Sequence, residues 1–315
     1  MKIRFLFVLL TLFALTVGDP AAALGPVALD PAKLKLASAN ALVLDAEAAR
    51  PIYAKAADEV TPIASVTKLM TAMVVLDAGQ ALDEPIAVDM DDFDFLKGSS
   101  SRLRMGATLT RTEMLRLALM ASENRAASSL ARHYPGGTEA AVAAMNAKAA
   151  ALGMTRSRFA DPTGLSPDNV STANDLAKMV SAAAGYPSIR DFSTTPSHYV
   201  EVQPAGSVVG FNNSNRLVRS GDWDIQLQKT GYIREAGRCL VMLVNIASKP
   251  IVIVLLDSVG KYTRIGDANR VKYWLETGKT MPVARAAAPV AKAKNGVKGT
   301  LAPAKLSGAV KGRAA

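Results

Sequence analysis

The hydrophobic positions of this chain form two groups of short apolar runs, with a long stretch of helix-spaced positions between them. Two β-prone runs, 41–45 and 51–55, are separated by only five residues, which predicts a hairpin. Three more strand-like runs, 225–229, 239–247 and 251–257, follow far downstream with turn residues between them. Because the links within each group are short, we expect antiparallel pairing.

The stretch between the two groups is predicted to contain helices and loops only. Thr110 with Glu113, and Thr172 with Asp175, have the spacing of a capping box at a helix start. Glycines mark helix ends at Gly153 and Gly185. The expected fold class is therefore α+β, with one five-stranded antiparallel sheet flanked by helices and a mostly helical lobe beside it. The expected helices cover residues 69–76, 114–120, 138–152, 172–185 and 266–277.

The N-terminus has the pattern of a secretory signal. Lys2 and Arg4 precede an apolar run at 5–17, and small residues follow at 21–23. The run is too short to cross a bilayer, so we expect residues 1–23 to be a cleavable signal peptide and the mature protein to be periplasmic. The single cysteine, Cys239, excludes an internal disulfide and a cysteine-based metal cluster.

The net charge of +10 comes mainly from the C-terminal tail. Residues 281–315 contribute +7 and the signal region +1, which leaves about +2 for the body at 24–280. The tail is rich in Ala, Pro, Gly and Lys, so we expect it to be disordered. It is either a solvated tail with no partner or a weak contact to anionic wall polymers or the membrane surface. Nucleic acid is not an expected partner, because an exported protein does not meet it.

The first candidate for chemistry is Ser65 followed three residues later by Lys68. The pair precedes the apolar helix expected at 69–76, and residues three apart on a helix share a face. Ser65 would lie in the first turn, where free N–H groups favour negative charge on an attacking oxygen. Alone, however, a serine and a lysine at this spacing are expected about once by chance in a chain of this length.

Two further motifs make the pattern specific. Ser122-Glu123-Asn124 ends the helix that begins after Thr110, and Lys229-Thr230-Gly231 ends a predicted strand. The order SxxK, SxN, KTG matches the motif set of penicillin-binding proteins and β-lactamases. The segments SENRAASSLARHYPGG, DIQLQKTG and AGRCLVM resemble the low-molecular-mass penicillin-binding proteins, and among them the D-alanyl-D-alanine endopeptidases of the penicillin-binding protein seven type. The resemblance covers about residues 35–282.

This resemblance implies a β-lactamase/DD-transpeptidase-like fold and a set of catalytic residues. Ser65 is the expected nucleophile, and a neutral Lys68 is its expected proton acceptor, with a pKa lowered by burial and by the second cation Lys229. Ser122 would relay the proton to the leaving amine. Asn124 would hold Lys68 and the substrate amide in register.

The KTG segment is implied to bind the substrate. Lys229 and Thr230 would receive a substrate carboxylate, and Gly231 would allow a close approach of the strand to the bound peptide. The backbone N–H groups of Ser65 and Tyr232 would form the oxyanion hole. The implied substrates are peptidoglycan stem peptides containing D-Ala, with β-lactams as covalent inhibitors.

Three activities remain open at this point. An endopeptidase is favoured, because large carboxypeptidase relatives carry a β-rich C-terminal domain and an amphipathic anchor, whereas the basic tail follows Trp274 almost at once. A D-alanyl-D-alanine carboxypeptidase is the alternative. A β-lactamase would need a carboxylate that activates water, and Asp161 in the segment 159–165 is its only candidate. No metal or other cofactor is expected, since His133 and His198 lack any ligand spacing.

Overall fold

The computed structural model describes residues 28–95 and 97–282. The predicted signal peptide at 1–23 and the basic tail beyond Pro282 lie outside these residues. Within the described part, no helix is long and apolar enough to span a bilayer.

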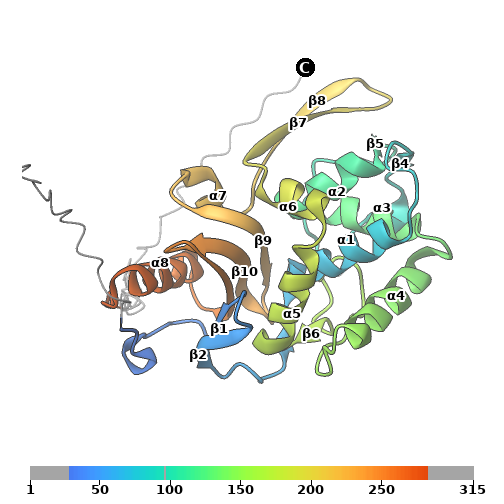
Figure 1. The fold of residues 1–315 in the computed structure, drawn as a ribbon. Coiled ribbons are helices and arrows are strands. Elements are labelled where there is room, and N and C mark those ends of the chain that lie inside the picture. The colour runs from blue at the N-terminus through green and yellow to red at the C-terminus, as the bar shows by residue number, and fades with distance from the viewer. Residues whose placement is uncertain (1–27, 96, 283–315) are drawn as a thin grey trace, which may run out of the picture. The chain divides into compact units, whose positions relative to one another are not determined.

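The predicted five-stranded antiparallel sheet is confirmed. Its strand order is β2-β1-β11-β10-β9, so the N-terminal hairpin pairs with the last strand and β9 forms an edge. Strands from both ends of the chain thus build one sheet, and the segment between them lies outside it (Figure 1). The strands are β1 (Asn40–Asp45), β2 (Arg50–Lys55), β9 (Asp224–Ile233), β10 (Gly237–Ile246) and β11 (Lys249–Ser258).

Both faces of the sheet are covered. Side chains alternate along a strand, so Ala41 and Val43 belong to the core under helix α8 (Thr263–Thr277), where Trp274 is fully buried. Leu42, between them, belongs to the core shared with the helical lobe. Central strands covered on both faces carry apolar residues at successive positions, which is why they read as continuous runs in the sequence.

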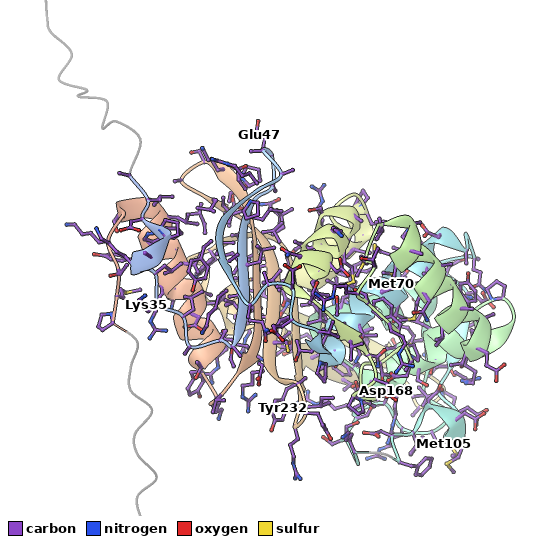
Figure 2. All side chains as sticks on the ribbon, turned by 90° about the horizontal axis from the view of Figure 1, so that it is seen from below. Lys35, Glu47, Met70, Met105, Asp168 and Tyr232 are labelled. Atoms are coloured by element: carbon purple, nitrogen blue, oxygen red, sulfur yellow. The ribbon has the colours of Figure 1, made fainter. Side chains whose placement is uncertain are left out.

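The helical lobe is built around helix α1 (Lys68–Asp77). Residues 68–75 are all buried, which is expected for a helix that is apolar on all sides, and Figure 2 shows Met70 inside the lobe. The other helices are α2 (Arg111–Met120), α3 (Asn124–Arg132), α4 (Gly137–Ala151), α5 (Ala173–Ala183), α6 (Pro187–Thr194) and α7 (Arg216–Ser220), with 3₁₀ turns η1 (Pro31–Lys33), η2 (Ala64–Thr67) and η3 (Met90–Asp92).

The helices predicted after Thr110 and Thr172 begin where expected, but the helix expected at 266–277 begins earlier, at Thr263. The Thr110 side chain accepts a hydrogen bond from the Glu113 N–H, as does Thr172 from Asp175. Neither capping box closes, however. The Glu113 carboxylate pairs with His198 at 2.8 Å, and the Asp175 carboxylate of α5 accepts from the Arg156 N–H and Ser157 Oγ instead. Half of each expected capping box is therefore replaced by a tertiary contact.

The expectation of helix and loop alone between the two strand groups is wrong. Six short strands lie there in three antiparallel pairs, and the longest pair is a hairpin that projects from the body (Figure 1). Half of the hairpin residues are solvent-exposed and only Val200, Val202 and Phe211 are buried, so its sequence carries too few apolar residues to predict the strands. The pairs are β3 (Thr61–Pro62) with β6 (Val170–Ser171), β4 (Pro85–Ala87) with β5 (Thr108–Thr110), and β7 (Ser197–Val202) with β8 (Ser207–Asn212).

Candidate active site

Ser65 lies in the 3₁₀ turn η2, directly before α1. The side chain of Lys68 reaches back one turn, and its Nζ lies 3.0 Å from Ser65 Oγ. Ala64, the preceding residue, has a φ of 49°, a left-handed conformation that costs an alanine about 1–2 kcal/mol. Such strained positions cluster at functional sites, where the surrounding structure holds a side chain in one orientation. The spacing predicted from the sequence therefore brings Ser65 and Lys68 into contact.

Lys68 is completely buried and surrounded by acceptors. Its Nζ donates to Ser65 Oγ, to Asn124 Oδ1 at 2.7 Å and to the Thr163 carbonyl at 2.6 Å. Burial lowers the pKa of Lys68 to about 7, although the negative charges of Asp161 and Glu123 oppose the shift. At neutral pH about half of this amine is therefore uncharged, and its free lone pair can accept a proton.

The lowered pKa predicts how acylation depends on pH. Only the neutral amine can take the Ser65 proton, so we expect the acylation rate with a fluorescent penicillin to rise as the pH increases through about 7 and then to level off. An arginine stays protonated throughout this range, so Lys68→Arg should react slowly and without the rise. Stopped-flow acylation rates between pH 5.5 and 9 test this. A wild-type rate that falls with increasing pH would contradict the assignment.

Ser122 is held beside the second buried lysine. It lies in the break between α2 and α3 with a left-handed φ of 61°, and its Oγ accepts a hydrogen bond from Lys229 Nζ at 2.7 Å. Burial, followed by the charges of Lys68 and Arg264, holds the pKa of Lys229 well below its usual range. The two lysines thus lie in one electrostatic system in which a proton on one disfavours a proton on the other.

Asn124 is the first residue of α3 and connects the two walls of the site. Its Oδ1 accepts a hydrogen bond from Lys68, and its Nδ2 donates to Ser99 Oγ at 2.9 Å. Ser99 belongs to the loop between η3 and β5. The amide of Asn124 is therefore fixed in one orientation by contacts on both sides.

The KTG segment lies inside β9 and does not end it, which corrects the sequence prediction. The strand continues to Ile233 because β10 pairs with it along its whole length, including Cys239 with Gly231. A Cβ on Gly231 would lie 2.8 Å from the Ile63 carbonyl oxygen and 3.1 Å from Ser65 N. Glycine at this position lets β9 pack directly against the turn that carries Ser65.

Tyr232 and Thr230 face different surroundings. The Tyr232 ring is half exposed, under the guanidinium of Arg238, and Figure 2 places it at the junction of the sheet and the helical lobe. Any contribution of Tyr232 to an oxyanion hole therefore rests on its backbone. Thr230 is buried, and its Oγ1 lies 2.7 Å from Ser214 Oγ.

A cleft of about 720 Å³ joins these groups. Six of the eight site residues predicted from the sequence line it, and the two lysines lie beneath its floor. Five lining residues escaped the sequence analysis, because none of them lies in a motif: Lys97, Ser99, Ser214, Glu235 and Arg264. Their contacts are with distant segments; Ser214 Oγ meets Thr230 Oγ1, and Arg264 Nη1 donates to the Gly231 carbonyl, 33 residues away, at 2.8 Å. The predicted residues that line the cleft are Ser65, Ser122, Asn124, Thr230, Gly231 and Tyr232.

Comparison with known proteins identifies the family of this site. The family model described as D-alanyl-D-alanine carboxypeptidase matches residues 27–260. The chain belongs to the D-alanyl-D-alanine carboxypeptidase family. It is thus a serine-type DD-peptidase, as the three motifs predicted.

Relatives and solved structures agree with this family. A D-alanyl-D-alanine endopeptidase of Escherichia coli is 47% identical over 92% of this chain and 93% of the relative, and one of Pseudomonas aeruginosa is 49% identical over 82% and 83%. The crystal structure of a Streptomyces DD-transpeptidase matches with a TM-score of 0.72 at 26% identity, over 77% of this chain and 98% of that one. A penicillin-binding protein of Listeria monocytogenes, solved in its ampicillin-bound form, gives a TM-score of 0.66 at 27% identity over 76% and 96%.

Asp161, the residue on which a β-lactamase activity would depend, has a structural role in this DD-peptidase. Its Oδ1 accepts hydrogen bonds from the N–H and Oγ1 of Thr163 and from the Gly164 N–H, at 2.6 to 2.8 Å. Its Oδ2 accepts from the Ser166 N–H at 2.8 Å and from Asn169 Nδ2 at 2.6 Å. Both oxygens thus hold the loop that presents the Thr163 carbonyl to Lys68, and this argues against a role as the base that activates water.

The histidines are also engaged away from the cleft. His133 Nδ1 lies 2.8 Å from the Ser129 carbonyl, and His198 pairs with Glu113. Among residues 28–95 and 97–282, no group of three or more His, Cys, Asp or Glu side chains could hold a metal ion.

Proposed function

We propose that this DD-peptidase is an endopeptidase that cleaves the peptide cross-links of peptidoglycan through an ester at Ser65. The observation that carries the proposal is the contact of Ser65 Oγ with a buried Lys68 amine whose pKa is about 7, at the floor of a long open cleft. The relatives named endopeptidase are 47% and 49% identical to the chain, whereas the relatives named carboxypeptidase from Bacillus subtilis and Escherichia coli are 31% identical or less, which favours the endopeptidase.

In the acylation step, the neutral Lys68 amine takes the proton of Ser65 while Ser65 Oγ attacks the D-alanyl carbonyl carbon. The negative charge on the carbonyl oxygen is received by the N–H groups of Ser65 and Tyr232. The close packing of Gly231 on Ser65 N supports this arrangement, because it brings β9, at the residue before Tyr232, against the turn that carries the Ser65 N–H. The loss of one such donor costs about 3–4 kcal/mol of transition-state stabilisation.

Departure of the leaving amine requires a proton, which Ser122 supplies. Lys229 donates a hydrogen bond to Ser122 Oγ and favours the form of Ser122 that has just lost its proton. The proton taken up by Lys68 then restores Ser122 as the amine leaves, so proton transfer balances over the step. Water subsequently hydrolyses the ester and releases Ser65.

The substrate lies along the part of β9 that lines the cleft, residues 230–233, an arrangement favoured because β9 is an edge strand of the sheet. A carboxylate of the substrate is received by Thr230 together with the cations on this side of the cleft. Arg264 lines the cleft itself. Lys229 is buried below the cleft surface and donates a hydrogen bond to Ser122, which lines the cleft. The same groups receive the carboxylate of a penicillin, which makes β-lactams covalent inhibitors.

Digestion of purified muropeptides tests the endopeptidase against the carboxypeptidase. We expect the mature protein to convert cross-linked dimers to monomers, as followed by mass spectrometry, and a Ser65→Ala variant to leave them intact. Removal of terminal D-Ala from monomeric pentapeptides, with dimers left unchanged, would show that the protein is a carboxypeptidase instead.

We also propose that the protein acts in the periplasm after removal of residues 1–23. The basic residues and the apolar run at the N-terminus support this, and so does the location of cross-linked peptidoglycan. The mass of the protein isolated from a periplasmic fraction tests it, because retention of residues 1–23 would contradict cleavage.

The basic tail contributes to wall attraction and not to catalysis in this proposal. Truncation after Met281 removes seven positive charges and little apolar surface, so we expect nearly unchanged turnover of soluble muropeptides. Binding to intact sacculi at low salt should fall, and the difference should disappear at high salt, because exposed charges are screened. Pelleting assays at two salt concentrations measure this, and a large loss of turnover on soluble substrate would contradict it.

A further inference from the structure

Glu123 stands between Ser122 and Asn124 in the sequence, and its side chain is buried beside the reaction centre. Only 8% of the residue is exposed. It caps α3, because Glu123 Oε1 accepts the Arg125 N–H at 3.3 Å, and its own N–H donates to the Leu117 carbonyl at 3.1 Å. The residue is therefore fixed at the junction of α2 and α3, and it does not line the active-site cleft.

The Glu123 carboxylate has no ion-pair partner. Arg125 Nη1 donates to the Leu103 carbonyl. Arg102 lines a cavity of about 300 Å³ together with Glu123, and it donates to the Gly210 carbonyl. Among residues 28–95 and 97–282, Glu123 takes part in no ion pair. A buried carboxylate without a cation is costly, and a helix cap does not require one, since serine, threonine or asparagine caps a helix as well.

Lys68 lies close to this buried charge. Asn124, the residue after Glu123, accepts a hydrogen bond from Lys68 Nζ at 2.7 Å, and charges interact strongly where water is excluded. Burial lowers the pKa of Lys68 to about 7, and the negative charges of Asp161 and Glu123 oppose that shift. The other charged group that faces Lys68 is Lys229, which favours the neutral form of the amine. Glu123 favours the protonated form.

Burial acts on Glu123 itself in the opposite sense. It raises the pKa of the Glu123 carboxyl, because the charged form loses its hydration. Hydrogen bonds from Ser101 and the Arg125 N–H oppose this rise, and so do the charges of Lys68 and Arg125. Glu123 therefore takes up a proton at a higher pH than an exposed glutamate, and its charge disappears at the acid end of the pH range.

We propose that Glu123 is a positioning residue of the acylation step that acts through Lys68, because its charge stabilises the ammonium that Lys68 becomes on taking the Ser65 proton. The charge makes the Lys68 amine a stronger base, and it leaves a smaller fraction of that amine neutral at acid pH. The inference rests on the proposed function, since it concerns the same proton acceptor. Glu123 itself contacts neither the substrate nor the reacting atoms.

Thermal unfolding at pH 7 distinguishes this role from a structural one. An ionised group whose pKa is raised in the folded state weakens the fold as the pH rises through that pKa. Glu123→Gln should therefore unfold at the same temperature as the wild type or at a higher one. A clearly lower unfolding temperature would show that the carboxylate serves the fold, and it would overturn the proposal.

The acylation rate with a fluorescent penicillin, measured between pH 5.5 and 9, tests the proposal in two variants. Glu123→Gln keeps the length of the side chain and removes its charge, whereas Glu123→Asp keeps the charge on a residue that also caps helices. We expect the Gln variant to begin its rise at lower pH, with a rate roughly two- to threefold above the wild type at pH 6. Its plateau at high pH should be lower, because a weaker base accepts a proton less readily. Glu123→Asp should keep the wild-type midpoint.

The matched control is Glu113→Gln. Glu113 lies in the first turn of α2, outside the cleft, and pairs with His198 at 2.8 Å. Its loss removes the same charge at a site away from Lys68, so the pH profile should be unchanged. A Glu123→Gln profile that differs from the wild type only by a constant factor would overturn the proposal, because structural damage scales a rate without moving its midpoint. A shift in Glu123→Asp as large as in Glu123→Gln would also overturn it.

The wild-type profile separates this inference from the proposed function. A wild-type rate that does not rise with pH would overturn the role of Lys68 as proton acceptor and this inference with it. A wild-type rate that rises through about pH 7, with an unshifted midpoint in Glu123→Gln, would overturn this inference alone.

Discussion

Replacement of Ser65 by alanine should abolish both peptide turnover and covalent labelling by a fluorescent penicillin. Ser65 Oγ is the hydroxyl that contacts the buried Lys68 amine at the floor of the cleft. Loss of an activated nucleophile removes the covalent route entirely, so turnover should fall by about 10⁴-fold or more. Gel fluorescence after exposure to the penicillin, together with muropeptide turnover, measures both effects.

The control for this variant is Ser181→Ala. Ser181 is an exposed serine on α5 that does not line the cleft, so its loss should leave labelling and turnover unchanged. Circular dichroism should show that both variants are folded. Undiminished labelling of the Ser65→Ala variant would mean that another residue is the nucleophile.

Replacement of Gly164 by alanine should disable the site without removing any catalytic group. Gly164 has a left-handed φ of +80°, and a Cβ at this position would lie 2.0 Å from the Ala64 carbonyl oxygen and 2.8 Å from Ser65 N. Backbone atoms cannot rotate away as a side chain can, so either the loop or the turn with Ser65 must move. We expect a loss of stability of about 2–4 kcal/mol and acylation slowed by at least about 100-fold.

A Gly221→Ala variant is the control, because it has the cost of a left-handed alanine without the steric clash. The φ of Gly221 is +76°, and no heavy atom lies within 4 Å of a Cβ built on it. Gly221→Ala should therefore lose only about 1–2 kcal/mol of stability and keep its acylation rate. Thermal unfolding and acylation rates of the two variants provide the comparison. Similar behaviour of both would contradict the close packing of Gly164 on the nucleophile turn.

The sheet and the three motifs could be predicted from the sequence because each leaves a local pattern. The central strands β1, β10 and β11 are mostly buried, so each contains a continuous apolar run, and the spacing of Ser65 and Lys68 is that of one helical turn. The sequence prediction located the KTG segment correctly but ended the strand too early, at Gly231. The extension to Ile233 depends on pairing with β10, which no local pattern records.

The groups that the sequence analysis missed act through contacts between distant segments. Arg264 and Ser214 lie in the cleft only because the sheet and the helical lobe meet there. Asp161 shows that the role of a residue can also depend on contacts that the sequence does not reveal. Its sequence context left a catalytic role open, and the five hydrogen bonds to its carboxylate show a structural one. The hairpin of β7 and β8 was missed for a different reason, since it has only three buried apolar residues.

Several energetically unfavourable features meet at the candidate site. Ala64 and Ser122 have left-handed backbones, and Lys68 and Lys229 are buried amines with lowered pKa values. Together they hold a neutral amine against a serine hydroxyl, which is the arrangement that nucleophilic catalysis requires.

Mass spectrometry of the protein after brief exposure to benzylpenicillin tests the central claim most directly. Both carboxylate oxygens of Asp161 are occupied within their own loop, so Asp161 is not placed to activate water. A penicillin also keeps its leaving group attached after the ring opens, so it blocks the cleft against the water that hydrolyses a peptidyl ester. We predict one adduct, on the peptide that contains Ser65, that persists for minutes or longer. An adduct that disappears within seconds while penicilloic acid accumulates catalytically, or an adduct on another residue, would contradict the account.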